Sequence, residues 1–88
     1  MLDRDTTSTT DRVAGLIHRM LSERSLGSPS SYDDDLRSLG MSSLDLVNLV
    51  LSVELEFDLS IPESDITPGR FRSISSIGTL VAALLPGS

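Results

Sequence analysis

Residues 39–57 read LGMSSLDLVNLVLSVELEF, which joins a sharp turn and two adjacent serines to a long apolar helix. Gly40 allows the turn, and we predict a helix from about Leu44 to Phe57. The apolar residues of this helix form two stripes: Leu46, Leu49, Val50, Val53 and Phe57 in the first, and Leu44, Val47, Leu51 and Leu55 in the second. Such a helix is either buried all round or keeps one stripe for a partner. Only two other long helices are available to cover it. We therefore favour the second alternative, in which one stripe stays exposed for a partner.

Two further long helices are predicted, one before and one after this stretch. The first begins near Thr10 and runs to about Ser25, with apolar residues at helical spacing: Val13, Leu16, Ile17, Met20 and Leu21. The last is capped by Ser73 and stopped by Pro86-Gly87, and its inward residues are Ile74, Ile77, Leu80, Val81, Leu84 and Leu85. Thr67-Pro68 predicts a short helical turn anchored by Phe71. No stretch alternates convincingly as a strand does, so the predicted fold class is all-α.

A long loop between Gly27 and Ser42 connects the first two helices, and loops of this length in small domains are often functional. We expect Tyr32, Leu36 and Leu39 to hold it against the core, which should include Val53, Phe57, Phe71 and Ile77. Residues 1–10 are polar and rich in threonine, which predicts a disordered tail, so residues 11–86 would form one domain.

The 88 residues carry a net charge of −6, and that charge is concentrated in one segment. All seven basic residues are arginines, and none lies between Ser38 and Gly69, where six acids occur. Nucleic acid is therefore a poor partner, because binding phosphates requires clustered basic residues. A basic protein surface is a better partner, although acidic surfaces also serve solubility alone.

The composition excludes several other classes. The chain has no cysteine, hence no disulfide or thiolate metal site, and no apolar run long enough to cross a membrane. The charged segment Met1–Asp5 does not resemble a signal peptide, so we expect a cytoplasmic protein, and a monomer. The acidic run Asp33-Asp34-Asp35 lacks the glycine and glutamate of an EF-hand loop, and we expect no metal site.

Ser43 is the strongest candidate for a functional residue. It follows a glycine turn at the mouth of a long helix, where backbone N–H groups and the helix dipole would stabilise an attached phosphodiester. Taken alone, Ser43 is better interpreted as an ordinary N-cap, and only the wider sequence reverses that preference. A hydrolytic serine would need a nearby base, but the only histidine, His18, lies off the apolar face of the first helix. No Gly-x-Ser-x-Gly motif is present either, so we expect no catalytic residue and no enzyme activity.

The wider sequence resembles the acyl and peptidyl carrier proteins over about residues 11–85. The resemblance rests on Leu39-Gly40-Met41-Ser42-Ser43-Leu44, on Glu54-Leu55-Glu56-Phe57 and on Ile61-Pro62. It implies a four-helix bundle of three longer helices and one short one, with a long first loop. It also implies that Ser43 receives 4′-phosphopantetheine from coenzyme A, so that the expected partners are a phosphopantetheinyl transferase, an acyl- or aminoacyl-loading enzyme and a downstream synthase or transferase.

The sequence departs from the family pattern at Ser42, where aspartate or histidine is usual. Two adjacent hydroxyls result, and alignment through Gly40, Leu44 and Phe57 favours Ser43 as the attachment point. Asn48 and Leu55 occupy positions that are often acidic in fatty-acid carriers, which argues against a housekeeping fatty-acid role. Residues 66–74 resemble the corresponding part of free-standing carriers in specialised metabolism. The resemblance therefore favours a free-standing carrier of small acyl or aminoacyl units in polyketide or nonribosomal-peptide-type metabolism. A fatty-acid carrier and a helical interaction domain without a covalent group remain the alternatives.

The second helix is the predicted docking surface for partner enzymes. Its second stripe follows Ser43 at helical spacing and lies on the side from which an attached arm would emerge. We expect the contact residues to be Leu44, Asp45, Val47, Asn48, Leu51 and Leu55, with Asp45, Glu54 and Glu56 as a charged rim. Alternatively, the first loop covers this stripe through Tyr32, Leu36 and Leu39.

Overall fold

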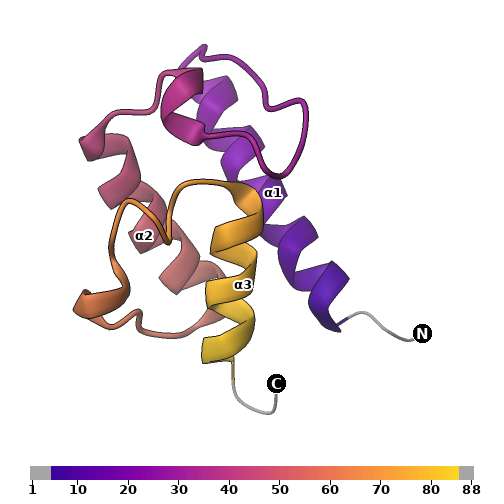
Figure 1. Cartoon of the computed structure of the whole chain (residues 1–88), viewed down its shortest axis with the longest axis vertical. Coiled ribbons are helices and arrows are strands. Elements are labelled where there is room, and N and C mark those ends of the chain that lie inside the picture. Colours follow the sequence, from indigo (N-terminus) through magenta and orange to yellow (C-terminus); the bar gives the residue numbers. More distant parts are fainter. Residues whose placement is uncertain (1–4, 86–88) are drawn as a thin grey trace.

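The computed structural model describes the backbone of residues 5–85 and the side chains from Thr9 onward, and all regular elements in this range are helical. Three α-helices, α1 (Asp5–Glu23), α2 (Ser43–Phe57) and α3 (Ile74–Leu84), are accompanied by two short 3-10 helices, η1 (Leu36–Leu39) and η2 (Glu63–Asp65). Figure 1 shows α3 in front of α1 and α2, and the long first loop crossing one end of the bundle. The predicted all-α class is confirmed, and none of the described helices is long and apolar enough to span a membrane.

The core lies between the inward faces of the three α-helices. From α2 it receives the first stripe, with Leu49, Val50, Val53 and Phe57 buried and Leu46 partly buried. From α3 it receives Ile74, Ile77, Leu80 and Val81, while Leu84 and Leu85 pack at its edge. The four residues predicted inside, Val53, Phe57, Phe71 and Ile77, are all less than 8% exposed. Met41 is buried and Met20 partly buried, so both pack in the core.

Two arginines connect α1 to the two ends of α2. Arg12 places its guanidinium 4.4 Å from the centre of the Phe57 ring and 2.9 Å from a carboxylate oxygen of Glu56. Arg24, directly after α1, pairs with Asp45 in the first turn of α2. At a rise of about 1.5 Å per residue, the two arginines and the two acids are each about 17 Å apart along their helices. The pairs match only if α1 and α2 run antiparallel, as they do in Figure 1.

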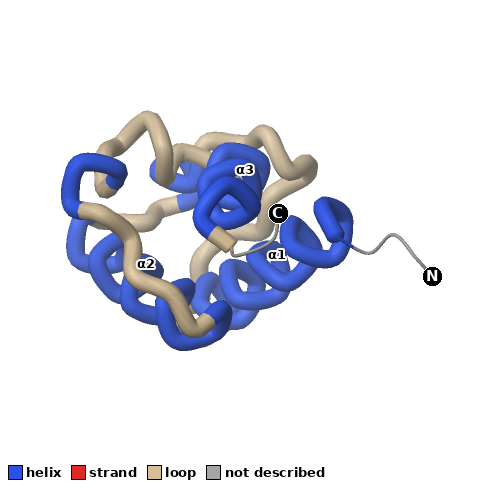
Figure 2. The backbone as a smooth tube through the Cα atoms, turned by 90° about the horizontal axis from the view of Figure 1, so that it is seen from below, coloured by secondary structure: helices blue, strands red, loops and turns tan. Residues whose placement is uncertain are grey.

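The long first loop is held by backbone hydrogen bonds to the segment that precedes α3. The Leu36 amide donates to the Arg72 carbonyl, and the Ser75 amide donates to the Tyr32 carbonyl, each at 2.8 Å. As predicted, Leu36 is fully buried and Leu39 packs against the core. The Tyr32 ring differs from the prediction, because it remains 40% exposed and its hydroxyl donates to Asp11. The tube in Figure 2 shows loops on both sides of α3, across the molecule from α1 and α2.

Two boundaries differ from the predictions. Helix α1 begins at Asp5, so the second half of the predicted disordered tail is helical. Threonines have modest helix propensity and Thr10 is a good cap, but the helix continues through it. The predicted turn at Thr67 is a single turn, in which the Phe71 amide donates to the Thr67 carbonyl, and the short helix η2 lies earlier. Pro86 and Gly87, predicted to stop the last helix, lie outside the described residues.

The packing predicts that Phe57 and Leu55 differ sharply in their effect on stability. Phe57 is 7% exposed and also supports Arg12, whereas Leu55, two residues earlier, is 83% exposed. Phe57→Ala should lower the free energy of unfolding by about 3–5 kcal/mol. Leu55→Ala should stay within about 0.5 kcal/mol of the wild type. Chemical denaturation of both variants measures this difference, and equal losses would contradict the assignment of the two stripes.

Candidate functional site

The turn before α2 needs Gly40. Its φ of 107° lies in the left-handed region, where side chains with a Cβ are strained. A Cβ at this position would also lie 3.0 Å from a methyl carbon of Leu26. The Gly40 amide donates to carbonyls of η1, and the chain then leaves the turn in the extended conformation of Ser42. The glycine therefore brings the two serines to the start of α2, as the sequence predicted.

The two serines have different roles in the structure. Ser42 is the N-cap of α2 and forms a capping box with Asp45, in which each residue accepts a hydrogen bond from the other's backbone amide. Ser43 is the first residue of the helix and is exposed. Within residues 5–85, the Ser43 hydroxyl makes no hydrogen bond. The reading of Ser43 as an ordinary N-cap is therefore wrong, because Ser42 supplies the cap and leaves Ser43 free.

Asp45 is the most constrained carboxylate of the site. It is only 2% exposed, and one of its oxygens accepts from the Ser42 amide at 2.9 Å and from the Ser42 hydroxyl at 3.1 Å. Its other oxygen pairs with Arg24. The Ser42 amide above all, and then the Ser42 hydroxyl and Arg24, hold the pKa of Asp45 below its ordinary value, although burial opposes the shift. Asp45 was expected to contact partners on the docking surface. That prediction is wrong, because its side chain is buried against Ser42 and Arg24.

The second stripe of α2 is open to solvent. Leu44 is 67% exposed, Val47 and Leu51 are each 53% exposed, and Leu55 is 83% exposed. Asn48 lies among them and is exposed as well. The first loop does not cover this strip, because Leu36 turns into the core and Tyr32 contacts α1 instead. Leu44, Val47, Leu51 and Leu55, hereafter the α2 strip, are therefore a row of apolar side chains that begins beside Ser43.

The acids expected to form a rim around this strip are held by the protein itself. A Glu54 carboxylate oxygen accepts from the Ile61 amide at 2.8 Å, and Glu56 pairs with Arg12. Together with the buried Asp45, these contacts occupy all three predicted rim residues. The prediction of an acidic rim is thus wrong for Asp45, and the two glutamates already have partners. Of the three acids, Glu56 and Asp45 have their charges compensated by an arginine.

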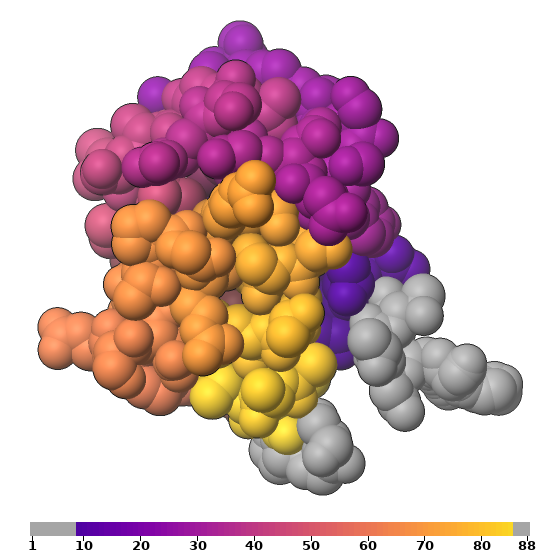
Figure 3. Space-filling model, in the orientation of Figure 1, coloured from indigo at the N-terminus to yellow at the C-terminus, as the bar shows by residue number. Residues whose placement is uncertain are grey.

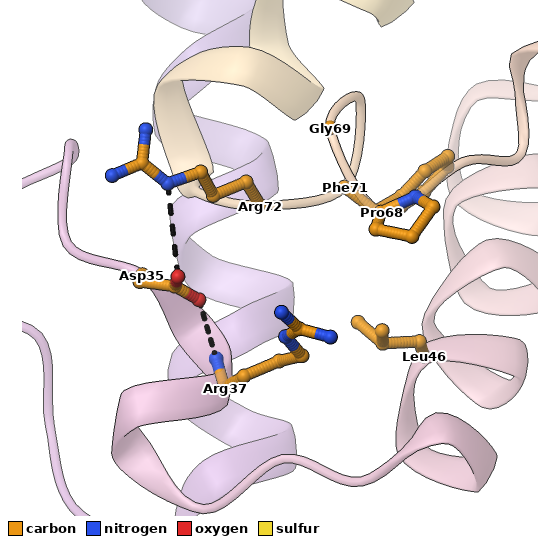
Figure 4. A pocket seen from close by; sticks show the side chains of 7 residues that line it. All are labelled: Asp35, Arg37, Leu46, Pro68, Gly69, Phe71 and Arg72. Atoms are coloured by element: carbon orange, nitrogen blue, oxygen red, sulfur yellow. Dashed lines mark hydrogen bonds and ion pairs between the residues drawn. The ribbon is translucent and has the colours of Figure 1, made fainter.

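A cavity of about 260 Å³ lies beside the first turns of α2. Leu46, Pro68 and Phe71 form its apolar part, and Asp35, Arg37, Gly69 and Arg72 complete the lining. Figure 4 shows the Arg37 side chain extending across it towards Leu46, while Asp35 accepts from the Arg37 amide at 2.9 Å and lies 3.7 Å from Arg72. Figure 3 shows the segment before α3 packed beside α3 on this face. The cavity is smaller than typical ligand pockets, which have volumes of about 300–1,000 Å³.

The remaining polar residues singled out in the sequence lie away from Ser43 or serve the fold. His18 is exposed on α1. Asp34 accepts from the Ser30 and Ser31 amides within its own loop, and Asp35 caps η1. Among the residues with described side chains, no three metal-ligating groups gather in one place. Sequence reasoning missed the role of Arg24, because nothing in the local pattern indicates which acid a surface arginine will meet.

Comparison with known proteins places the chain among carriers. Residues 11–84 match the family model described as a phosphopantetheine attachment site. Aminoacyl carrier protein 1 of Bradyrhizobium diazoefficiens is 35% identical over 79 residues, which span 90% of this chain and 88% of the relative. Aminoacyl carrier protein 2 of the same organism is 32% identical over 71 residues, covering 81% of this chain and 80% of the relative.

Solved structures agree with the sequence relatives. One similar chain comes from a crystal structure of Bradyrhizobium japonicum glycine:[carrier protein] ligase complexed with its cognate carrier protein and an analogue of glycyl adenylate. It has a TM-score of 0.72 and 35% identity, over 84% of this chain and 96% of that one. A second, from the ligase complexed with glycylated carrier protein, has a TM-score of 0.69 and 35% identity, over 81% of this chain and 96% of that one.

The buried carboxylate predicts a specific loss of stability in acid. Because the folded-state pKa of Asp45 is lowered, its contribution is present above the ordinary pKa of about 3.9 and is lost as the pH falls through the lowered value. As the pH is lowered from about 5 through 3 and below, the melting temperature of the wild type should therefore fall more than that of Asp45→Asn. The pKa of Asp34 is also lowered, chiefly by the Ser30 amide. Because Asp34 is present in both proteins, its effect on stability cancels when the two are compared. Parallel melting curves would contradict the assigned role of Asp45.

Proposed function

This chain belongs to the carrier proteins that have a phosphopantetheine attachment site, and on that basis we propose that Ser43 carries the phosphopantetheine arm. The observation that supports Ser43 as the attachment site is that the two serine hydroxyls make different contacts. The Ser42 hydroxyl is engaged with Asp45, whereas the Ser43 hydroxyl is exposed and makes no hydrogen bond within the described residues. A free hydroxyl at the surface is what a modifying enzyme requires.

The start of α2 suits the phosphodiester that such an attachment creates. The first amides of a helix have no intrahelical partner, and the Ser42 hydroxyl takes only that of Asp45. The amides and the positive end of the helix dipole would therefore stabilise a phosphate on Ser43. The neighbouring carboxylate of Asp45 turns inward to Arg24, so it does not oppose the phosphate from solvent. When attached, the arm supplies a terminal thiol that holds cargo as a thioester.

Ser43 acts as an acceptor and not as a catalyst. Its Oγ forms a bond to the phosphorus that bears the pantetheine half of coenzyme A, the pyrophosphate P–O bond breaks, and the adenosine bisphosphate half leaves. The hydroxyl proton passes to a base of a phosphopantetheinyl transferase. In the described part of the chain, no imidazole or carboxylate accepts a hydrogen bond from Ser43.

The cargo that we propose is an aminoacyl group, loaded by an amino-acid-activating ligase. The curated relatives are named aminoacyl carrier proteins, and the similar solved chains come from complexes of a glycine:[carrier protein] ligase. Exposed Asn48 and Leu55 replace acids that are frequent in fatty-acid carriers and further support this choice. A downstream transferase or synthase of specialised metabolism would then accept the aminoacyl group.

The α2 strip is the docking surface that we propose for these enzymes. It starts one residue after Ser43, and a partner that admits the arm to its active site must come close to it. Exposed apolar rows of this kind mark protein interaction sites on small proteins. Since the nearby acids Asp45, Glu54 and Glu56 are engaged within the protein, apolar contact should dominate and binding should depend little on salt.

Replacement of each serine by alanine tests the attachment site. Ser43→Ala should abolish the mass gain on incubation with coenzyme A and a phosphopantetheinyl transferase, because the acceptor oxygen is gone. Ser42→Ala should retain the mass gain at a lower rate and lose about 1 kcal/mol of stability, since it removes the cap. Intact-mass spectrometry measures both proteins. Modification of Ser43→Ala would exclude Ser43 as the attachment site.

Substitutions on the α2 strip test docking. Leu51→Ala and Leu55→Glu should remain folded, because both side chains are more than half exposed, but should slow aminoacylation of the holo protein. The measurement is kcat/KM with an aminoacyl:carrier-protein ligase at low and high salt, with Asp58→Asn at the far end of α2 as a control. If both strip variants are folded and react at wild-type rates, the proposal that the α2 strip is the docking surface is wrong.

A further inference from the structure

Arg24 is connected to the attachment site through a buried carboxylate. It follows the last residue of α1, and within the described residues its guanidinium forms an ion pair only with Asp45. The arginine is half exposed, but Asp45 is 2% exposed and lies in the first turn of α2. Asp45 in turn holds the amide and the hydroxyl of Ser42 at 2.9 and 3.1 Å. This chain of contacts ends one peptide bond before Ser43.

Each link in this chain depends on the one before it. A buried carboxylate without a cationic partner is unfavourable and either moves towards water or takes up a proton. Both responses weaken the hydrogen bonds that hold Ser42 in its extended capping conformation. The presence of serine at position 42 fits this arrangement, because its hydroxyl donates to Asp45, which an ionised carboxylate could not do. The cap, the buried acid and Arg24 thus form one unit.

We propose that Arg24 is a positioning residue for the modification of Ser43: through Asp45 and Ser42 it fixes the first turn of α2 and hence the place of the Ser43 hydroxyl. This inference rests on the proposed function, since it concerns the reaction in which Ser43 accepts the arm. Transfer to phosphorus needs the attacking oxygen in line with the leaving group, and a displacement of about 1 Å can cost up to about 100-fold in rate. Arg24 touches neither reactant and acts only through its neighbours.

The structure provides a matched control in Arg12. Like Arg24, it belongs to the α1 segment, is about half exposed and pairs with an acid of α2, but at the opposite end of that helix. Arg12 also lies over the Phe57 ring, so its loss should weaken α1–α2 packing at least as much. A general loosening of the fold would therefore affect both arginine variants, whereas positioning of Ser43 would be lost only with Arg24.

The experiment compares the full-length apo proteins of the wild type, Arg24→Gln, Arg24→Lys and Arg12→Gln, at a temperature where circular dichroism shows all four folded. Transfer from coenzyme A by a phosphopantetheinyl transferase of broad specificity is followed by intact mass. We expect kcat for Arg24→Gln to fall roughly tenfold with little change in KM, partial recovery in Arg24→Lys, and near wild-type kinetics in Arg12→Gln.

Hydrogen exchange provides a readout that does not depend on the transferase. The amides of Ser42 and Asp45 donate within the capping box, so both should exchange faster in Arg24→Gln than in Arg12→Gln. Unchanged kcat in folded Arg24→Gln, or an equal loss in Arg12→Gln, would overturn the positioning role alone. A wild-type protein that gains no mass would overturn the proposed function together with this inference.

Discussion

The contact between α1 and α2 is the constraint on which the rest of the structure depends. Arg12 and Arg24 meet Glu56 and Asp45 at opposite ends of α2, and this match fixes the antiparallel alignment of the two helices. With that alignment set, the first stripe of α2 lies in the core, and the α2 strip faces solvent. The exposed Arg12–Glu56 pair contributes little free energy by itself, since surface ion pairs are weak. The importance of the two pairs lies in selecting one helix arrangement and in compensating the buried charge of Asp45.

The same contacts determine the character of the exposed face. Acids that would otherwise surround the α2 strip are turned towards α1 or towards the turn after α2, where Glu54 accepts from the Ile61 amide. A helix from a strongly acidic segment therefore presents mainly apolar groups near Ser43. Net charge read from a sequence gives the total field of the protein. It does not give the charge of one face, because ion pairs within the fold determine which charged side chains a partner can contact.

Much of the site could be predicted from local sequence. Gly40 followed by two serines and an apolar run indicates a turn and a helix start, and the period of the apolar residues separates the buried stripe from the exposed one. Which serine caps the helix could not be settled in this way, because both are good caps at adjacent positions. The reciprocal contact with Asp45 resolves this, since a capping box places the acid three residues after the cap. The acid at that spacing from Ser42 was visible in the sequence, but its burial was not.

The sequence by itself determined the helical class, the two faces of α2, most of the core and the resemblance to carriers, because all of these depend on periodicity and short-range motifs. It also indicated the family to which residues 11–84 belong. Only the tertiary structure decided that Asp45 is buried and that Arg24 is its partner. The reason is physical: periodicity describes one helix at a time, whereas burial and ion pairing depend on which residues of a distant segment arrive beside it. Arg24 and Asp45 become neighbours only when α1 and α2 pack together.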